Sequence, residues 1–213
     1  MTTLPRCVLF DMDDTLVVTR QVKWQQHKYV AKHAYGIDLT DEKLAQHWGE
    51  PFAQMLGHLY ENSASTEDMI AEYRKLHGRF PKLEQPGAVA LTKRLLARGA
   101  VVGVVTSMLG EVSRPDLVRL GFPIDQFLTV QGSDDCEFAK PDPRVFTPII
   151  DRLAAMGISE DQTVYVGDAL IDQEAAEGAG IGFIGVSTGL AKPSAFPSGT
   201  PVFGSLEAAG ELL

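Results

Sequence analysis

The sequence predicts an α/β protein in which a doubly wound, Rossmann-like parallel sheet carries an inserted domain of four helices. Short apolar runs rich in β-branched residues alternate with amphipathic helical patterns, as in parallel sheets covered by helices on both faces. One long segment near the N-terminus lacks any strand signal. With 213 residues, 45% of them hydrophobic and 22% charged, the chain can bury a substantial core. We therefore expect a core domain of residues 1–17 and 84–213, and a helical domain of residues 18–83 inserted in it.

The strands of the core are predicted from short apolar runs that each precede a turn signal. Four runs are clear, namely Cys7–Phe10, Val101–Thr106, Thr163–Val166 and Gly182–Val186, and two are weaker, Leu128–Val130 and Pro201–Phe203. The helices between them are predicted from apolar residues on one face and a glycine near the end. They are Ala88–Arg98, Val145–Met156 and Gln173–Ala179.

The inserted segment, from about Val18 to Lys82, is predicted to be helical throughout. It holds all five histidines and both tryptophans of the chain. Turn-forming residues divide it into roughly four helices, and they lie at Gly36, Asp38–Thr40, Gly49–Pro51 and Ser63–Thr66.

The net charge limits the kinds of partner that we expect, and the cysteines limit the kinds of disulfide and metal site. The net charge is −9, which disfavours nucleic acid and anionic membranes as partners. Cys7 and Cys136 have no CxxC neighbour, so we expect neither a disulfide framework nor a zinc site. No signal-peptide pattern and no apolar run of the ~20 residues that a membrane span needs is found. We expect a cytoplasmic protein, a monomer or a small homo-oligomer.

The first acidic motif follows the first strand directly. Asp11 and Asp13 stand after an apolar run, at the carboxyl end of a predicted parallel strand, where open α/β sheets bind ligands. Their side chains start on the same face while the chain stays extended, and two close carboxylates are best tolerated beside a cation. The alternative is a plain acidic turn.

A second acidic motif follows another apolar strand. Gly167 permits a sharp turn, Asp168 lies at the strand end, and Asp172 lies one helical turn further on. Together with Asp11 and Asp13, these carboxylates supply the hard oxygen ligands that Mg²⁺ prefers. The sequence therefore predicts a Mg²⁺ site.

Two further segments supply a hydroxyl and a positive charge. Thr106 and Ser107 end the strand that starts at Val101, where a hydroxyl and the free N–H groups of a following helix could hold a phosphate oxygen. The alternative is a simple helix cap. Lys140 stands in Lys-Pro-Asp-Pro, a stiff segment that could hold its ammonium beside carboxylates and phosphate. The alternative is a solvated surface lysine.

These motifs together resemble those of the haloacid dehalogenase superfamily, in order and approximate spacing. The resemblance covers the core nearly end to end and rests on Asp11-x-Asp13-x-Thr15, Thr106, Lys140-Pro141 and Gly167-Asp168-x-x-x-Asp172. The helical insert resembles the cap of the phosphoglycolate phosphatase and β-phosphoglucomutase-like branch. In relatives the position after Asp13 is often glycine, whereas here it is Asp14.

The resemblance implies a role for each motif residue. Asp11 would be the nucleophile that accepts the phosphoryl group, and Asp13 would act as general acid and then general base. Thr106 and Lys140 would position the transferring group, with Ser107 beside them. Asp11, Asp168 and the main-chain carbonyl of Asp13 would hold Mg²⁺, and Asp172 would orient the metal's ligands. Phosphoryl transfer needs this kind of positioning and charge neutralisation.

One loop of the insert is a candidate for substrate recognition. In similar proteins the loop that corresponds to His47, Trp48 and Gly49 faces the active site and recognises the leaving group of the substrate. A turn between two helices, with Trp48 packed in the core, is an equally good interpretation. The other histidines show no metal-ligand spacing in the sequence.

The leading hypothesis is Mg²⁺-dependent hydrolysis of a small phosphate monoester through an aspartyl-phosphate, with a small phosphorylated metabolite as partner. A phosphomutase would use the same residues, and a non-catalytic binding module on this fold is the alternative from another class. A dehalogenase is disfavoured because halide displacement needs neither Asp13 nor the second acidic motif. Phosphonate cleavage would need a lysine that forms a Schiff base, and only Lys23, Lys28 or Lys32 could supply it.

Overall fold

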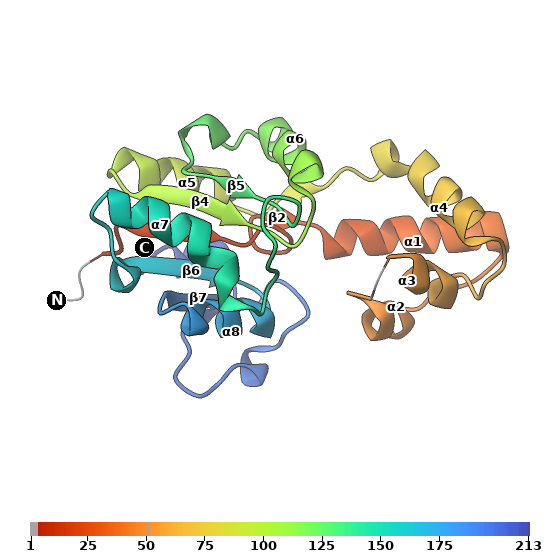
Figure 1. The fold of residues 1–213 in the computed structure, drawn as a ribbon. Coiled ribbons are helices and arrows are strands. Elements are labelled where there is room, and N and C mark those ends of the chain that lie inside the picture. The colour runs from red at the N-terminus through yellow and green to blue at the C-terminus, as the bar shows by residue number, and fades with distance from the viewer. Residues whose placement is uncertain (1–3, 51) are drawn as a thin grey trace. The chain divides into compact units, whose positions relative to one another are not determined.

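The computed structural model describes residues 4–50 and 52–213 and divides into two compact units (Figure 1). One unit comprises Met1–Val18 and Glu84–Leu213, and the other comprises Thr19–Leu83. The predicted helical break at Gly49–Pro51 includes Pro51, which lies outside the described residues. Each unit has a hydrophobic core of its own.

A six-stranded sheet forms the centre of the larger unit, in the order β5-β4-β1-β6-β7-β8. Its paired strands are all parallel, which confirms the predicted α/β fold. The strands are β1 (Cys7–Phe10), β4 (Val101–Val105), β5 (Val130–Gln131), β6 (Thr163–Gly167), β7 (Gly182–Val186) and β8 (Val202–Phe203). A separate two-stranded sheet pairs β2 (Val17–Val18) with β3 (Leu83–Glu84).

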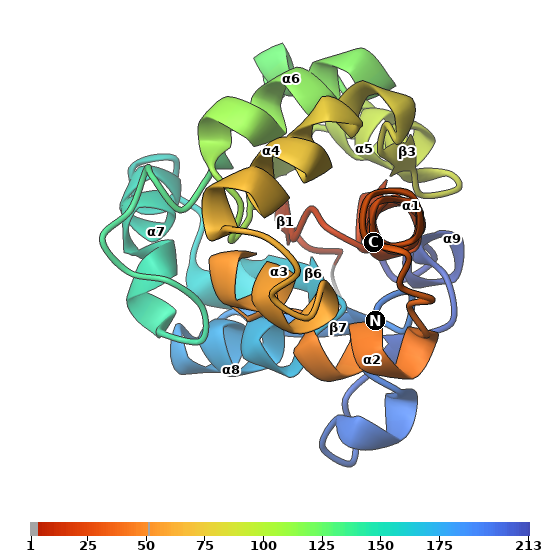
Figure 2. The ribbon, with the colours of Figure 1, turned by 90° about the vertical axis from the view of Figure 1, so that its right-hand side faces the viewer.

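Helices cover both faces of this sheet (Figures 1 and 2). On one face, Val8 and Phe10 of β1 pack with α5 (Ala88–Ala97), α6 (Gly110–Leu120) and α9 (Leu206–Ala209). On the other, Cys7 and Leu9 pack with α7 (Thr147–Ala155) and α8 (Leu170–Gly178). The alternation of side chains along β1 thus supplies both cores.

The structure departs from the predicted elements where short polar or proline-containing segments turn out to be helical. Helix α6 was not predicted because Pro115 interrupts its pattern, and proline inside a helix normally breaks it. Helix α8 begins at Leu170 instead of the predicted Gln173, and α7 begins at Thr147, after the 3-10 helix Pro143–Phe146.

In its described residues the smaller unit contains four α-helices, which agrees with the roughly four predicted. They are α1 (Arg20–Tyr35), α2 (Asp41–His47), α3 (Phe52–Leu59) and α4 (Thr66–Lys75), followed by a short 3-10 helix, His77–Arg79. Helix α4 packs against α1 and α3, and α2 packs against α3. Helix α1 ends at Gly36 in a left-handed conformation. In the part of the chain that the structure describes, no helix has the length and apolarity to cross a membrane.

A buried histidine lies in the core of the four-helix unit. His27 on α1 is 1% exposed, its Nδ1 lies 2.9 Å from the Tyr60 hydroxyl, and its ring stacks on Tyr73 with 4.6 Å between ring centroids. Burial, together with the nearby charge of Lys23, lowers the pKa of His27 to about 3. The imidazole is therefore neutral in the folded unit at neutral pH.

Replacing His27 tests this environment through the pH dependence of stability. Because the folded-state pKa lies below the ordinary 6.5, the unfolded chain binds a proton more readily, so stability is full above pH 6.5 and falls towards pH 3. The loss reaches about 1.4 kcal/mol for each pH unit within that window. We expect His27→Gln to flatten this part of the profile.

The measurement is urea unfolding at several pH values followed by tryptophan fluorescence, because both tryptophans, Trp24 and Trp48, belong to the helical unit. His33→Gln is the matched control, since His33 is exposed on the same helix. An unchanged slope in His27→Gln would show that the buried imidazole does not titrate in this way.

Candidate active site

The candidate site lies where three neighbouring strands end. Strand β1 lies between β4 and β6, and Phe10 is in register with Val104 on one side and Val166 on the other. Asp11 follows β1, Thr106 follows β4 and Asp168 follows β6. The carboxyl ends of parallel strands share one edge of a sheet, and the order of strands reverses direction here, which is the usual place for a ligand site in such folds.

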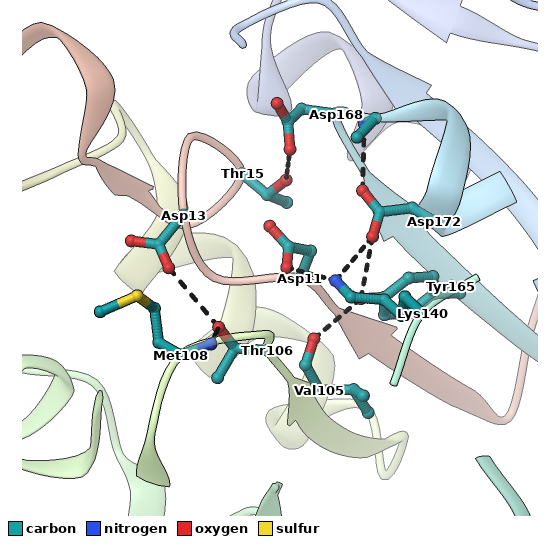
Figure 3. A network of polar contacts seen from close by, with 11 residues as sticks. Asp11, Asp13, Thr15, Val105, Thr106, Met108, Lys140, Tyr165, Asp168 and Asp172 are labelled. Atoms are coloured by element: carbon teal, nitrogen blue, oxygen red, sulfur yellow. Dashed lines mark hydrogen bonds and ion pairs between the residues drawn. The ribbon is translucent and has the colours of Figure 1, made fainter. Parts of the chain in front are cut away.

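Lys140 reaches this edge and lies between two aspartates (Figure 3). Its Nζ lies 2.7 Å from Asp11 Oδ1 and 2.6 Å from Asp172 Oδ1. The three side chains are 3%, 8% and 1% exposed, respectively. Lys140 is therefore a buried charge held by two carboxylates, and not the solvated surface lysine that the sequence left as an alternative.

Tyr165 completes the surroundings of the ammonium and was not recognised from the sequence. Its hydroxyl accepts a hydrogen bond from Lys140 Nζ (3.0 Å) and donates one to the carbonyl oxygen of Val105 (2.8 Å). The residue is fully buried in β6, and burial raises the pKa of its hydroxyl, so that it stays protonated. In the sequence, Tyr165 lies within the apolar run Thr163–Val166, and an aromatic residue there indicates only a core side chain.

Contacts to both carboxylate oxygens hold the Asp172 side chain in place. While Oδ1 pairs with Lys140, Oδ2 accepts the backbone N–H of Ala169 at 3.0 Å. Gly167 is required for this approach, because a Cβ at that position would lie 2.6 Å from Asp172 Oδ2. The early start of α8 places Asp172 in the first turn of the helix, where a carboxylate is favoured by the helix dipole.

Asp13 and Thr106 lie together beside this cluster. Asp13 is half-buried, and Thr106 Oγ1 lies 3.5 Å from Asp13 Oδ2, at the limit of a hydrogen bond. Thr106 Oγ1 also accepts the N–H of Met108 at 3.1 Å. Ser107 is exposed. The first N–H of the following helix, that of Gly110, donates to Asp134 Oδ1 at 2.6 Å.

Asp14 adopts a backbone conformation that few residue types enter readily. Its φ is +59°, in the left-handed region, which glycine, asparagine and aspartate enter most readily. Its carbonyl oxygen accepts hydrogen bonds from Gln85 Nε2 (3.1 Å) and Thr188 Oγ1. Thr15, in the same turn, places Oγ1 3.5 Å from Asp168 Oδ1.

The cluster contains more acidic groups than basic groups. Burial raises the pKa of Asp11 to about 7, although the nearby Lys140 acts in the opposite direction. The pKa of Asp168 rises to about 9, first through burial and then through the charges of Asp11 and Asp172. Burial by itself would lower the pKa of Lys140, but its acidic neighbours raise it well above the usual value. One ammonium cannot neutralise three carboxylates.

A divalent cation fits this arrangement. Carboxylate oxygens of Asp11, Asp168 and Asp172 lie within 4.8 Å of one another, and hard oxygen ligands are those that Mg²⁺ prefers. A positive ion would also reverse the upward pKa shifts that mutual repulsion causes. Gly189, a second residue missed from the sequence, lies against the Asp168 carboxylate and leaves no space for a Cβ.

The three candidate recognition residues of the insert belong to the helical unit. Trp48 packs edge-on against Trp24 and His27, with ring centroids 6.2 and 6.3 Å apart, which supports the interpretation of Trp48 as a core side chain. His47 Nδ1 lies 2.9 Å from Glu50 Oε1, and Gly49 is exposed. A role for His47, Trp48 and Gly49 in reading a substrate stays a prediction.

The sequence and the fold both match known proteins. The family described as haloacid dehalogenase-like hydrolase matches residues 8–186. A phosphoglycolate phosphatase from Rhodospirillum rubrum is 34% identical over 224 residues, which cover 99% of this chain and 91% of the relative. A pyrophosphatase PpaX from Halalkalibacterium halodurans is 28% identical over 178 residues, with 82% and 80% covered.

Solved structures share the fold. One from Thermotoga maritima, described as a "putative beta-phosphoglucomutase", has a TM-score of 0.82 at 23% identity and covers 98% of this chain and 100% of its own. A hydrolase of the same superfamily, subfamily IA, from Geobacter sulfurreducens has a TM-score of 0.73 at 18% identity, with 98% and 96% covered.

Removing the hydroxyl of Tyr165 should weaken the fold at the site. Tyr165→Phe keeps the ring but leaves the Val105 carbonyl without its donor and Lys140 with one partner fewer. We expect the free energy of unfolding to fall by about 1–3 kcal/mol, the usual cost of a buried polar group left unpaired. Urea unfolding followed by circular dichroism measures this change.

Tyr29→Phe is the matched control, because it also removes one hydroxyl, which accepts a hydrogen bond from the exposed Arg79. We expect its effect to stay within about 0.5 kcal/mol. Equal stabilities of Tyr165→Phe and the wild type would mean that this hydroxyl does not support Lys140.

Proposed function

The chain belongs to the haloacid dehalogenase-like hydrolases, and from this premise we propose that it is a Mg²⁺-dependent phosphatase that hydrolyses a small phosphate monoester through a phosphorylated Asp11. The proposal places the activity in the cytoplasm, on a small phosphorylated metabolite. The observation that carries it is the buried contact of Lys140 with Asp11 and Asp172, beside Asp168. An acidic nucleophile, a fixed positive charge and a set of oxygen ligands together suit phosphoryl transfer.

In the proposed first step, an oxygen of Asp11 attacks the phosphorus of the substrate and forms an acyl-phosphate bond. The bond between phosphorus and the oxygen of the leaving alcohol breaks, and the alcohol keeps that electron pair. Asp13 gives the leaving oxygen a proton. The half-buried position of Asp13, at the edge of the cluster, suits a group that must meet both the leaving alcohol and water.

In the proposed second step, Asp13 takes a proton from a water molecule as that water attacks the phosphorus. The bond between phosphorus and Asp11 breaks, the carboxylate is restored and inorganic phosphate leaves. Lys140 stabilises the negative charge on Asp11 and on the transferring group through both steps. Thr106 Oγ1, at the end of β4, would orient a phosphoryl oxygen, with Ser107 as a second contact.

Asp11, Asp168 and the main-chain carbonyl of Asp13 would hold the metal, and Asp172 would orient this set. Both oxygens of Asp172 already have partners, Lys140 and the Ala169 N–H, which supports an orienting role over a ligating one. When bound, Mg²⁺ would supply the positive charge that the carboxylates and the phosphoryl oxygens require.

The relatives and the acidic chain support a small phosphorylated metabolite as the substrate class. The Rhodospirillum rubrum relative is named as a phosphoglycolate phosphatase, and it is matched over nearly the whole chain. Phosphoglycolate is therefore the first substrate to test, with pyrophosphate second because of the PpaX relative. The helical unit would act as a cap that selects the leaving group, with His47, Trp48 and Gly49 as candidate contacts.

The direct test is phosphate release by the purified protein from a panel of phosphorylated metabolites, with and without Mg²⁺. We expect activity that requires Mg²⁺ and is lost in Asp11→Asn, which keeps the side-chain shape but removes the nucleophile. Asp13→Asn should lower kcat by about 10²–10⁴, the usual contribution of a general acid or base. Asp151→Asn, at an exposed position on α7, is the control that should stay active.

Two outcomes would contradict the proposal. A wild-type protein as inert as Asp11→Asn across the whole panel would point to a binding module on the same fold. Isomerised sugar phosphate in place of free phosphate would point to a phosphomutase, which would use the same residues.

A further inference from the structure

The helical unit holds a second cluster of potential metal ligands, built from His47, Glu50 and His58. The Nδ1 atom of His47 lies 2.9 Å from one oxygen of Glu50, and the Nδ1 atom of His58 lies 2.8 Å from the other. The three ligand atoms lie within 4.8 Å of one another. The two imidazole rings face each other with 4.4 Å between their centroids, at an interplanar angle of 36°.

The fold brings these residues together from two helices and the turn between them. His47 ends α2, Glu50 stands in the turn that follows, and His58 lies in the last turn of α3. The backbone N–H of Glu50 donates to the carbonyl oxygen of His47 at 3.2 Å and sets the turn. Helices α2 and α3 pack against each other (Figure 2). Sequence spacing alone gave no sign of this cluster, because the third ligand comes from a different helix.

The chemistry of the three groups differs from that of the Asp11 cluster. Hydrogen bonds from His47 and His58 lower the pKa of Glu50, so its carboxylate is charged at neutral pH. Two imidazole nitrogens and one carboxylate are ligands that zinc and the neighbouring late first-row metals prefer, whereas Mg²⁺ prefers oxygen ligands alone. Three protein ligands also leave one position of a tetrahedral ion for water.

We propose that His47, Glu50 and His58 form a binding site for a late first-row divalent cation, with Zn²⁺ as the fitting ion. The side chains of His47, Glu50 and His58 are 15%, 27% and 42% exposed, so an ion can reach the site from solvent. The carboxylate at its centre already attracts both imidazoles, and the ion would take the place of their hydrogen bonds to Glu50.

Binding at this site would join the end of α2 to α3 and stabilise the folded helical unit. A cation that binds the folded state and not the unfolded state raises the free energy of unfolding with its concentration. The site lies outside the groups assigned to phosphoryl transfer, except that His47 is also a candidate substrate contact. The inference therefore stands whether or not the chain is a phosphatase.

The test measures Zn²⁺ binding to the full chain by equilibrium dialysis in excess Mg²⁺, which competes for the carboxylates of Asp11 and Asp168. The wild type should bind one equivalent of Zn²⁺ that His58→Gln and Glu50→Gln lose. Removing a ligand should weaken this binding at least about tenfold, because even the loss of a residue behind a ligand commonly costs that much. His33→Gln should bind as the wild type does, because His33 belongs to the same unit and lies outside the cluster.

Thermal unfolding followed by tryptophan fluorescence gives a second readout in the helical unit. Zn²⁺ should raise the Tm of the wild type and of His33→Gln, and should leave the Tm of His58→Gln and Glu50→Gln unchanged. The variants' Tm without Zn²⁺ shows that they are folded. The inference is overturned if the wild type binds no such equivalent, or if both cluster variants bind it as the wild type does.

Discussion

The site depends on one buried interaction, the contact of the Lys140 ammonium with the carboxylates of Asp11 and Asp172. A charge in the protein interior is tolerated only when it is paired and hydrogen-bonded. The pairing forms only when β1, the first turn of α8 and the segment before the 3-10 helix Pro143–Phe146 are all in place. The Tyr165 hydroxyl also contacts the ammonium. Because each of these segments comes from a different part of the chain, the site exists only when the core is folded.

The same interaction explains why the cluster suits a divalent cation. Lys140 balances at most one of the three carboxylates, and the pKa values of Asp11 and Asp168 rise as a result of burial and repulsion. The fold thus brings together more acidic groups than one ammonium can balance, and a bound divalent cation would let these groups ionise. The helical unit has a core of its own and its own group of potential metal ligands, so its stability, and the ion binding proposed for it, can be measured independently.

The strand ends and the charged residues at them could be predicted from the sequence, because apolar runs that end in Asp11 or Asp168 carry both signals at once. The partners within the site could not. Tyr165 has the pattern of a core residue, and only the structure shows that its hydroxyl reaches the Val105 carbonyl, on the far side of β1, and contacts Lys140. Gly189 lies far along the chain from Asp168, and the start of α8 at Leu170 depends on the contact of Asp172 with the Ala169 N–H. Helix α6 was hidden by Pro115, and the His47, Glu50 and His58 cluster by the packing of α3 on α2.

The central claim is that Lys140 and Asp172 stabilise each other in the buried cluster, and a double-mutant cycle measures this directly. The free energy of unfolding would be compared for the wild type, Lys140→Met, Asp172→Asn and the double variant. A control cycle uses Asp151→Asn, at a distant position, in place of Asp172→Asn. We expect a coupling of about 1–3 kcal/mol between Lys140 and Asp172, because each single change removes the oppositely charged contact that the other buried side chain makes at 2.6 Å. Effects that add to within about 0.5 kcal/mol, as expected for independent positions, would contradict it.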